Sequence, residues 1–157
     1  MKKSLIIKIV LVILFAVLFF VSYKRAITPQ VTDQNMGGII EIPITYVKSS
    51  SDMIVVELPF PGSVTGKEFS VIGKARGTWF FEASFPITVL DKDGNTIAQG
   101  IAQAQNDWMT TEFVPFKADI KIPDTYIGKA TLVLRKDNPS GLPEHDASIS
   151  FPFTIEY

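Results

Sequence analysis

The segment Glu144-His145-Asp146 holds the only histidine of the chain between two carboxylates, and Ser140 lies five residues upstream. An imidazole beside carboxylates is a candidate general base, and a nearby serine suggests a hydrolytic triad. The surrounding sequence is rich in turn formers and lacks the Gly-x-Ser-x-Gly elbow that presents a nucleophilic serine. We therefore interpret the segment as a solvated loop. A hydrolase or transferase that uses Asp107, His145 or Asp146 is the alternative.

A second set of oxygen-bearing side chains occurs in Asp91-Lys92-Asp93-Gly94-Asn95, where alternate positions resemble half of a calcium loop. An EF-hand also needs flanking helices and a glutamate at its twelfth position, which here is Ala102. The chain offers no cysteine and no second histidine for another kind of metal site. The sequence thus predicts no metal and no cofactor, and the segment predicts a hairpin turn because Gly94 and Asn95 tolerate positive φ.

Arg76, Trp79, Phe80 and Glu82 form the first candidate binding cluster, in which two opposite charges flank an aromatic wall. The competing interpretation is structural. In that case Arg76 forms an ion pair within the chain and stacks on a ring, which closes the turn at Gly77.

Trp108 is the centre of the second candidate binding cluster. It lies in a predicted corner at residues 106–109, and Asn138 and Ser140 belong to a predicted loop at residues 136–141. The indole either plugs the end of the fold or is exposed beside that loop as a binding patch, and the sequence leaves both interpretations open.

The elements that position these residues are predicted to be β-strands, because the apolar residues recur with a period of two. The longest run, residues 78–90, predicts a single strand with one apolar face made of Trp79, Phe81, Ala83, Phe85, Ile87 and Val89. Further strands are predicted at residues 39–46, 53–58, 69–75, 96–105, 116–122, 130–135 and 149–155. Pro152 in the last of these lacks an N–H and predicts an edge strand or a bulge. Short strands separated by turn signals, without helical patterns, predict an all-β sandwich or barrel.

The N-terminal segment, residues 1–25, is basic and mostly apolar, and no polar residue interrupts positions 9–21. Residues 5–23 are long enough to cross about 30 Å of hydrocarbon as a helix. We predict an uncleaved transmembrane anchor, with a cleaved signal peptide as the alternative. The excess of lysine before the apolar core places the N-terminus inside and the domain outside the cytoplasmic membrane. Residues 26–38 predict a flexible tether, and residues 39–157 the domain.

The charge of the chain is uneven. Residues 26–157 contain ten basic and all sixteen acidic residues, a net charge of −6. This argues against nucleic acid as a partner, because phosphate binding needs a concentrated basic surface. The absence of cysteine excludes disulfides and a lipid-modified cysteine.

Several motifs occur in a characteristic order: Gly73-x-Ala75-Arg76-Gly77-x-Trp79-Phe80-Phe81-Glu82-Ala83-Ser84-Phe85-Pro86, Asp93-Gly94, Asp107-Trp108-Met109, Pro115-Phe116 and Lys136-Asp137-Asn138-Pro139-Ser140-Gly141. Together they resemble the bacterial spore germination immunoglobulin-like domain, from about residue 54 to residue 155. The resemblance implies an immunoglobulin-like β-sandwich of bacterial envelope proteins, often attached to a GerM-type domain in spore-forming species. It implies no catalytic residues.

We therefore expect an all-β immunoglobulin-like β-sandwich of seven to nine antiparallel strands, preceded by one N-terminal transmembrane helix, as a solitary domain and not an enzyme. We expect it to lie at the bacterial cytoplasmic membrane and to bind or organise a cell-envelope polymer or an envelope protein. The expected binding residues are those of the two clusters: Arg76, Trp79, Phe80 and Glu82, or Trp108, Asn138 and Ser140. Addition of a partner's strand to an open sheet edge is a further possibility.

Overall fold

The computed structural model describes residues 42–157, which belong to one compact unit. The predicted membrane helix at residues 5–23, the tether and the start of the first predicted strand lie outside the described residues. Within residues 42–157, no helix is both long and apolar enough to cross a membrane.

Nine strands and two short 3₁₀ helices make up the described part of the chain, which confirms the all-β prediction. The strands are β1 (Thr45–Val47), β2 (Ile54–Leu58), β3 (Val64–Thr65), β4 (Glu68–Arg76), β5 (Ser84–Leu90), β6 (Thr96–Ala104), β7 (Phe113–Lys121), β8 (Gly128–Arg135) and β9 (Ser148–Ile155). The 3₁₀ helices are η1 (Gly77–Trp79) and η2 (Pro143–His145).

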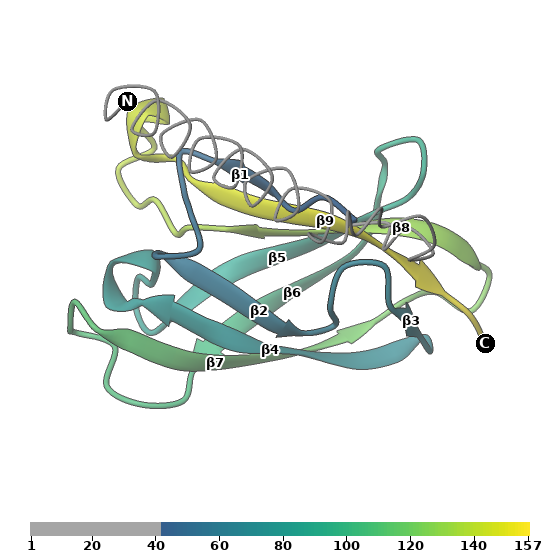
Figure 1. The fold of residues 1–157 in the computed structure, drawn as a ribbon, viewed down its shortest axis with the longest axis horizontal. Coiled ribbons are helices and arrows are strands. Elements are labelled where there is room, and N and C mark those ends of the chain that lie inside the picture. Colours follow the sequence, from purple (N-terminus) through teal and green to yellow (C-terminus); the bar gives the residue numbers. More distant parts are fainter. Residues whose placement is uncertain (1–41) are drawn as a thin grey trace, which may run out of the picture. The chain divides into compact units, whose positions relative to one another are not determined.

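The strands hydrogen-bond in the order β1-β9-β8-β5-β6-β7-β4-β2, and β3 pairs separately with β9. All pairs are antiparallel except β3 with β9, which is parallel. Strand β6 pairs with β5 along its length but with β7 only at Gln103 and Ala104, so the sheet folds over there into two facing layers (Figure 1). Phe69 of β4 meets Phe153 of β9 edge-on across the layers, with ring centroids 5.5 Å apart.

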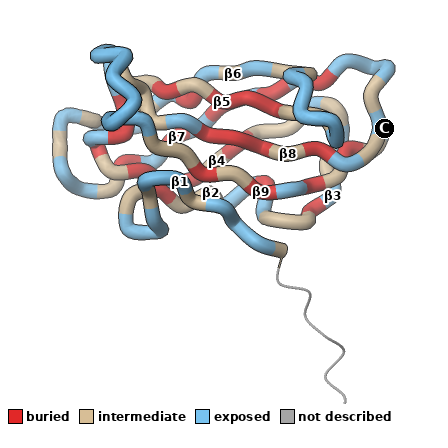
Figure 2. Tube along the Cα trace, turned by 90° about the horizontal axis from the view of Figure 1, so that it is seen from above, coloured by how far each residue is buried: buried red, intermediate tan, exposed pale blue. Residues whose placement is uncertain are grey.

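The space between the layers is filled by residues at every second strand position, as the sequence pattern predicts. In β9 the buried positions are Ile149, Phe151, Phe153 and Ile155, and in β7 they are Val114, Phe116, Ala118 and Ile120. Figure 2 shows these buried segments along the strands and exposed segments in the loops. Burying one such side chain contributes roughly 1.5–3 kcal/mol, so packing between the layers holds a domain that has no disulfides.

Antiparallel strands deliver their loops to two opposite ends of the sandwich. The first, which we name the η1 end, gathers residues 48–53, 77–83, 105–112 and 136–147. Hydrogen bonds join these segments: Arg76 N donates to Met53 O (2.8 Å), Gly77 N to Glu112 O (3.1 Å) and Asp137 N to Trp79 O (3.1 Å). The second, the β3 end, gathers residues 58–67, 91–95 and 122–127, where Ile122 N donates to Lys67 O (2.8 Å).

The single strand predicted over residues 78–90 is wrong in its first half, because β5 begins only at Ser84. Phe81 and Ser84 exchange two backbone hydrogen bonds of 3.0 Å around Glu82 and Ala83, whose φ values are +48° and +61°. Positive φ at both central residues is the geometry of a type I′ hairpin turn. Asn and Gly are the residues that usually occupy the two central positions of this turn. Glu82 and Ala83 occupy them here, so the sequence carried no signal for the turn. The predicted alternation therefore holds only from Phe85 onward.

Pro152 does not mark a sheet edge, because β9 is paired on both sides. Strand β1 pairs with Ser148–Ser150 and β3 with Thr154 and Ile155, so Pro152 lies in the gap between these two short strands. Its carbonyl points into this gap and accepts a hydrogen bond from Gly62 N (2.8 Å). The N–H and C=O groups of one strand residue point to the same side. The N–H that Pro152 lacks would therefore also point into this gap, where neither β1 nor β3 offers a strand partner.

Candidate functional site

Trp79 and Phe80, two of the predicted binding residues, are part of the core. Trp79 is 0% exposed and Phe80 is 4% exposed. Both rings pack on Phe85, with centroids 6.2 and 5.2 Å away, and Phe85 packs on Phe116 at 5.0 Å. The interpretation of these two residues as an exposed aromatic wall is therefore corrected. The 3₁₀ turn η1, which the period-two pattern did not reveal, directs both consecutive rings inward.

Arg76 has a structural role, as the second interpretation of the sequence proposed. Its guanidinium donates to Asp52 O (3.0 Å) and Thr111 O (3.2 Å) and lies 3.4 Å from the Glu112 carboxylate. It also stacks over the Phe113 ring, 4.2 Å from the centroid. The pairing differs in detail from the sequence expectation, since Glu82 is not a partner of Arg76. Arg76 thus ties the 48–53 segment to the 105–112 segment.

Glu82 and Trp108 are accessible at the η1 end to different degrees. Glu82 is exposed on the tight turn before β5. Trp108 is half-buried and packs against the core, so it plugs the end of the sandwich while part of its side chain stays exposed. The neighbouring Met109 is 77% exposed.

Asn138 organises the loop between β8 and β9. Its amide donates to Leu142 O (2.9 Å) and to the Asp146 carboxylate (2.7 Å), and its side-chain oxygen accepts from Ser140 Oγ (2.5 Å). The Ser140 hydroxyl also contacts His145 Nδ1 (3.0 Å). The loop is therefore held in one shape by its own polar side chains, although it is largely exposed.

The geometry around His145 is not that of a Ser-His-Asp triad. Such a triad needs a carboxylate on one ring nitrogen and the serine on the other. Here Ser140 contacts Nδ1, while the Asp146 carboxylate contacts the Asn138 amide. Asp107 caps its own loop by accepting from Met109 N (3.0 Å). The groove beside this loop is lined by Asp146 but by neither Asp107 nor His145.

Asp91 forms the hairpin turn that the sequence predicted. Its carboxylate accepts from the Asn95 amide (3.0 Å) and from the backbone N–H groups of Asn95 and Asp93 (both 2.8 Å). These hydrogen bonds, with the Asn95 side chain first, hold the pKa of Asp91 below its usual value. Among residues 42–157, no three His, Cys, Asp or Glu side chains gather as metal ligands do.

A groove of about 350 Å³ adjoins the Asn138 loop and was missed from the sequence. We name it the cationic groove after Lys48, Arg135 and Lys136, which line it together with Asp146. Lys48 Nζ donates to Pro143 O (2.6 Å), and Arg135 Nη1 donates to Thr88 Oγ1 (3.0 Å). No carboxylate in the described part of the chain forms an ion pair with any of the three cations. Only the β1–β9–β8 pairing brings Lys48 beside Arg135, so the sequence held no local signal for this site.

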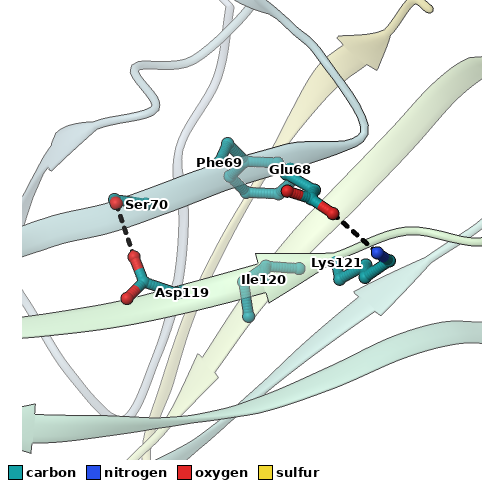
Figure 3. Close-up of a pocket in the computed structure, with 6 residues that line it drawn as sticks. All are labelled: Glu68, Phe69, Ser70, Asp119, Ile120 and Lys121. Atoms are coloured by element: carbon teal, nitrogen blue, oxygen red, sulfur yellow. Dashed lines mark hydrogen bonds and ion pairs between the residues drawn. The ribbon is translucent and has the colours of Figure 1, made fainter.

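A second hollow, on β4 and β7, is internally neutralised (Figure 3). Ser70 Oγ donates to the Asp119 carboxylate (2.6 Å), and Lys121 Nζ contacts the Glu68 carboxylate at 2.7 Å. The Ser70 hydrogen bond, followed by Lys117, lowers the pKa of Asp119, and Lys121 lowers that of Glu68. These groups are cross-strand pairs that engage one another, and they leave no converging set of free polar atoms.

The two-layer fold, with its accessible polar groups in end loops, defines an immunoglobulin-like β-sandwich. The family model of the immunoglobulin-like domain of bacterial spore germination (Gmad2) matches residues 53–142, more than half of the chain, and the chain belongs to this family. The resemblance noted in the sequence is thereby confirmed, and the match includes every residue of the two candidate clusters. No curated protein and no solved structure matches the chain.

Proposed function

We propose that this protein is a non-catalytic, membrane-anchored immunoglobulin-like module that lies outside the bacterial cytoplasmic membrane and binds an anionic component of the cell envelope. Family membership supports a non-catalytic module. The apolar residues 5–23 and the preceding lysines support the membrane location. The observation that carries the choice of ligand is the cationic groove.

The charge of the groove is the reverse of that of the rest of the domain. Residues 26–157 carry a net charge of −6, yet three cations and one carboxylate line this single groove. Arginine binds phosphate and carboxylate groups through two parallel hydrogen bonds, and lysine adds a compact positive charge. An envelope polymer with repeated phosphate or carboxylate groups fits such a surface.

The Asn138 loop supplies the rigid wall of this site. Asp146 and Pro143 line the groove and belong to the loop whose shape Asn138 and Ser140 fix. A wall that is already ordered loses little conformational freedom on binding, which favours affinity. Trp108 and Glu82 are accessible at the same end and could give a long polymer further contacts, whereas Trp79 and Phe80 belong to the core and Arg76 ties the loops together.

Co-sedimentation of residues 34–157 with purified cell-wall sacculi tests the proposal. We expect saturable binding that falls at least tenfold in the double variant Arg135→Gln/Lys136→Gln and falls with added salt. The matched control is Lys74→Gln/Lys129→Gln, which removes the same charge from exposed positions outside the groove and leaves binding unchanged. Equal loss in both double variants would reduce the effect to net charge and contradict a groove site.

Chemical removal of phosphate polymers from the sacculi separates the two kinds of anion. If binding disappears, the ligand is a phosphate polymer. If binding persists, the ligand is the set of carboxylates of the wall. Absence of saturable binding to either preparation would overturn the polymer ligand and leave an envelope protein as the partner. Crosslinking in intact membranes would then identify that protein.

A further inference from the structure

The β3 end carries an exposed apolar loop that the proposed function does not use. Residues 58–66 contain no charged side chain, and Leu58, Phe60 and Val64 are 49%, 58% and 59% exposed. A soluble surface rarely leaves several large apolar side chains exposed side by side, and such clusters mark contacts with partners or membranes. The exposed side chains of this loop therefore indicate contact with an apolar partner.

These three side chains share one groove. They line a hollow of about 470 Å³ together with Pro59, Phe69 and Ile72, and most of its exposed lining is apolar. Two further exposed apolar side chains lie at the same end, since Ile127 precedes the Gly128–Ile155 pair and Tyr157 follows it. The apolar surface thus extends from the groove toward the end of β9.

Part of the backbone of the loop is hydrogen-bonded within the domain. Gly62 N donates to Pro152 O (2.8 Å), Ser63 N to Phe60 O (3.0 Å) and Thr154 N to Ser63 O (2.9 Å). Polar backbone groups without hydrogen-bond partners are costly in a lipid environment. These internal hydrogen bonds therefore lower the free-energy cost of moving the loop from water into lipid.

The chain enters the domain at this same loop. Ile42 is the first described residue, and its Cδ1 occupies the position next to Gly62, 2.0 Å from where a Cβ would lie. Residues 24–41 separate this point from the end of the predicted membrane helix. If these residues form the tether that the sequence predicts, a segment of that length would span roughly 20–25 Å on average, which would keep the loop within reach of the membrane surface.

We propose that the 58–66 loop inserts Leu58, Phe60 and Val64 into the interfacial layer of the membrane that anchors the chain. This inference rests on the proposed membrane anchor. A bilayer is favoured as the occupant because the loop carries no charge and because the chain that enters the domain beside it at Ile42 carries the predicted anchor. Tethering supplies the remaining affinity by keeping the loop at high local concentration beside the lipid.

The position of the loop relative to lipid can be measured directly because the chain has no cysteine. Phe60→Cys gives a single attachment point for a nitroxide in the full-length chain, reconstituted in phosphatidylcholine vesicles. Met109→Cys is the matched control, since Met109 is 77% exposed at the η1 end. The readout is the ratio of spin-label accessibility to oxygen and to a water-soluble nickel chelate.

We expect the label at position 60 to favour oxygen by at least threefold over the label at position 109, and to do so equally in neutral and anionic vesicles because the loop is uncharged. The same label on residues 42–157 without lipid should show the ratio of a water-exposed site. Protection in that lipid-free sample would indicate a protein contact and overturn the lipid assignment. Equal ratios at positions 60 and 109 in vesicles would overturn it as well.

Alkaline extraction of the vesicles separates failure of this inference from failure of the anchor. A chain that stays in the pellet with a water-exposed label at position 60 contradicts only the insertion of the loop. A chain that is washed away contradicts the proposed anchor itself.

Discussion

The loops of the η1 end and the 58–66 loop of the β3 end extend from the same antiparallel strands, yet they differ in how their polar groups are hydrogen-bonded. At the η1 end, side chains such as Arg76 and Asn138 bond to backbone and to one another across loops. At the β3 end, the 58–66 loop relies on backbone hydrogen bonds alone and exposes apolar side chains. The difference shows that loop shape and loop chemistry are set separately. A loop held by polar side chains and an uncharged loop with exposed apolar side chains can share one core.

The largest predicted effect tests whether the η1 end depends on the core beneath it. Phe85→Ala removes the ring on which Trp79, Phe80 and Phe116 all pack. We expect the free energy of unfolding to fall by about 3–5 kcal/mol, measured by urea denaturation of residues 34–157. Phe81→Ala is the control, because Phe81 is 41% exposed, and it should cost much less. Similar losses in both variants would refute the assignment of the aromatic cluster as core.

A smaller effect is expected where the η1 end is tied together. A Cβ at Gly77 would lie 1.9 Å from Thr110 O, so Gly77→Ala must push the 105–112 segment away. We expect a loss of about 1–3 kcal/mol with faster hydrogen exchange in that segment. Gly66→Ala at the β3 end is the matched variant, since its Cβ would meet nothing closer than 4.0 Å. Unchanged exchange in residues 105–112 would show that the close contact is not maintained in solution.

Asn138→Ala should loosen the η1 end without disturbing the β3 end. The change removes two donors and one acceptor from the loop, at a cost of about 1–2 kcal/mol in local stability. Hydrogen exchange should rise in residues 138–146 and stay constant in residues 58–66. Equal rises at both ends would mean that the loops are not independent.

The smallest predicted effect concerns the cross-strand pairs between the two ends. Ser70→Ala removes the hydrogen bond that most lowers the pKa of Asp119, so this pKa should rise toward its ordinary value. A lowered pKa in the folded state stabilises the fold above the ordinary carboxyl pKa. That stabilisation is lost as the pH falls through the folded-state value, so the variant should be less sensitive to acid in that range. Carboxyl titration by NMR measures the shift, and an unchanged pKa would show that Lys117 suffices alone.

Much of the scaffold was predictable because burial imposes a period of two on strand residues. The alternation in β7 and β9 located both strands, and the Asp-Gly-Asn sequence located the hairpin after β5. The turn at Glu82 and Ala83 was not predictable, because neither residue type prefers the positive φ that both adopt here. The burial of Phe80 followed from the 3₁₀ turn η1, which the period-two pattern did not reveal either.

The candidate site was less predictable than the fold. Asn138 and Ser140 stood out through their turn-forming sequence, but their mutual bonding required the loop geometry. The cationic groove required the register of β1, β8 and β9, since Lys48 is distant in sequence from Arg135 and Lys136. Sites assembled by long-range pairing leave no local pattern.

The interior position of β9 also has a consequence for the time course of folding. Strand β9 supplies Phe151 and Phe153 to the core and joins β8 to both β1 and β3, so the two layers cannot close before residue 155 is available. Thr45 pairs with Ser150, a contact between opposite ends of the described chain. Contacts this distant in sequence require closure of long loops and slow the search for the native state. A chain still emerging from a ribosome or a translocation channel would therefore remain unfolded until its final strand is free.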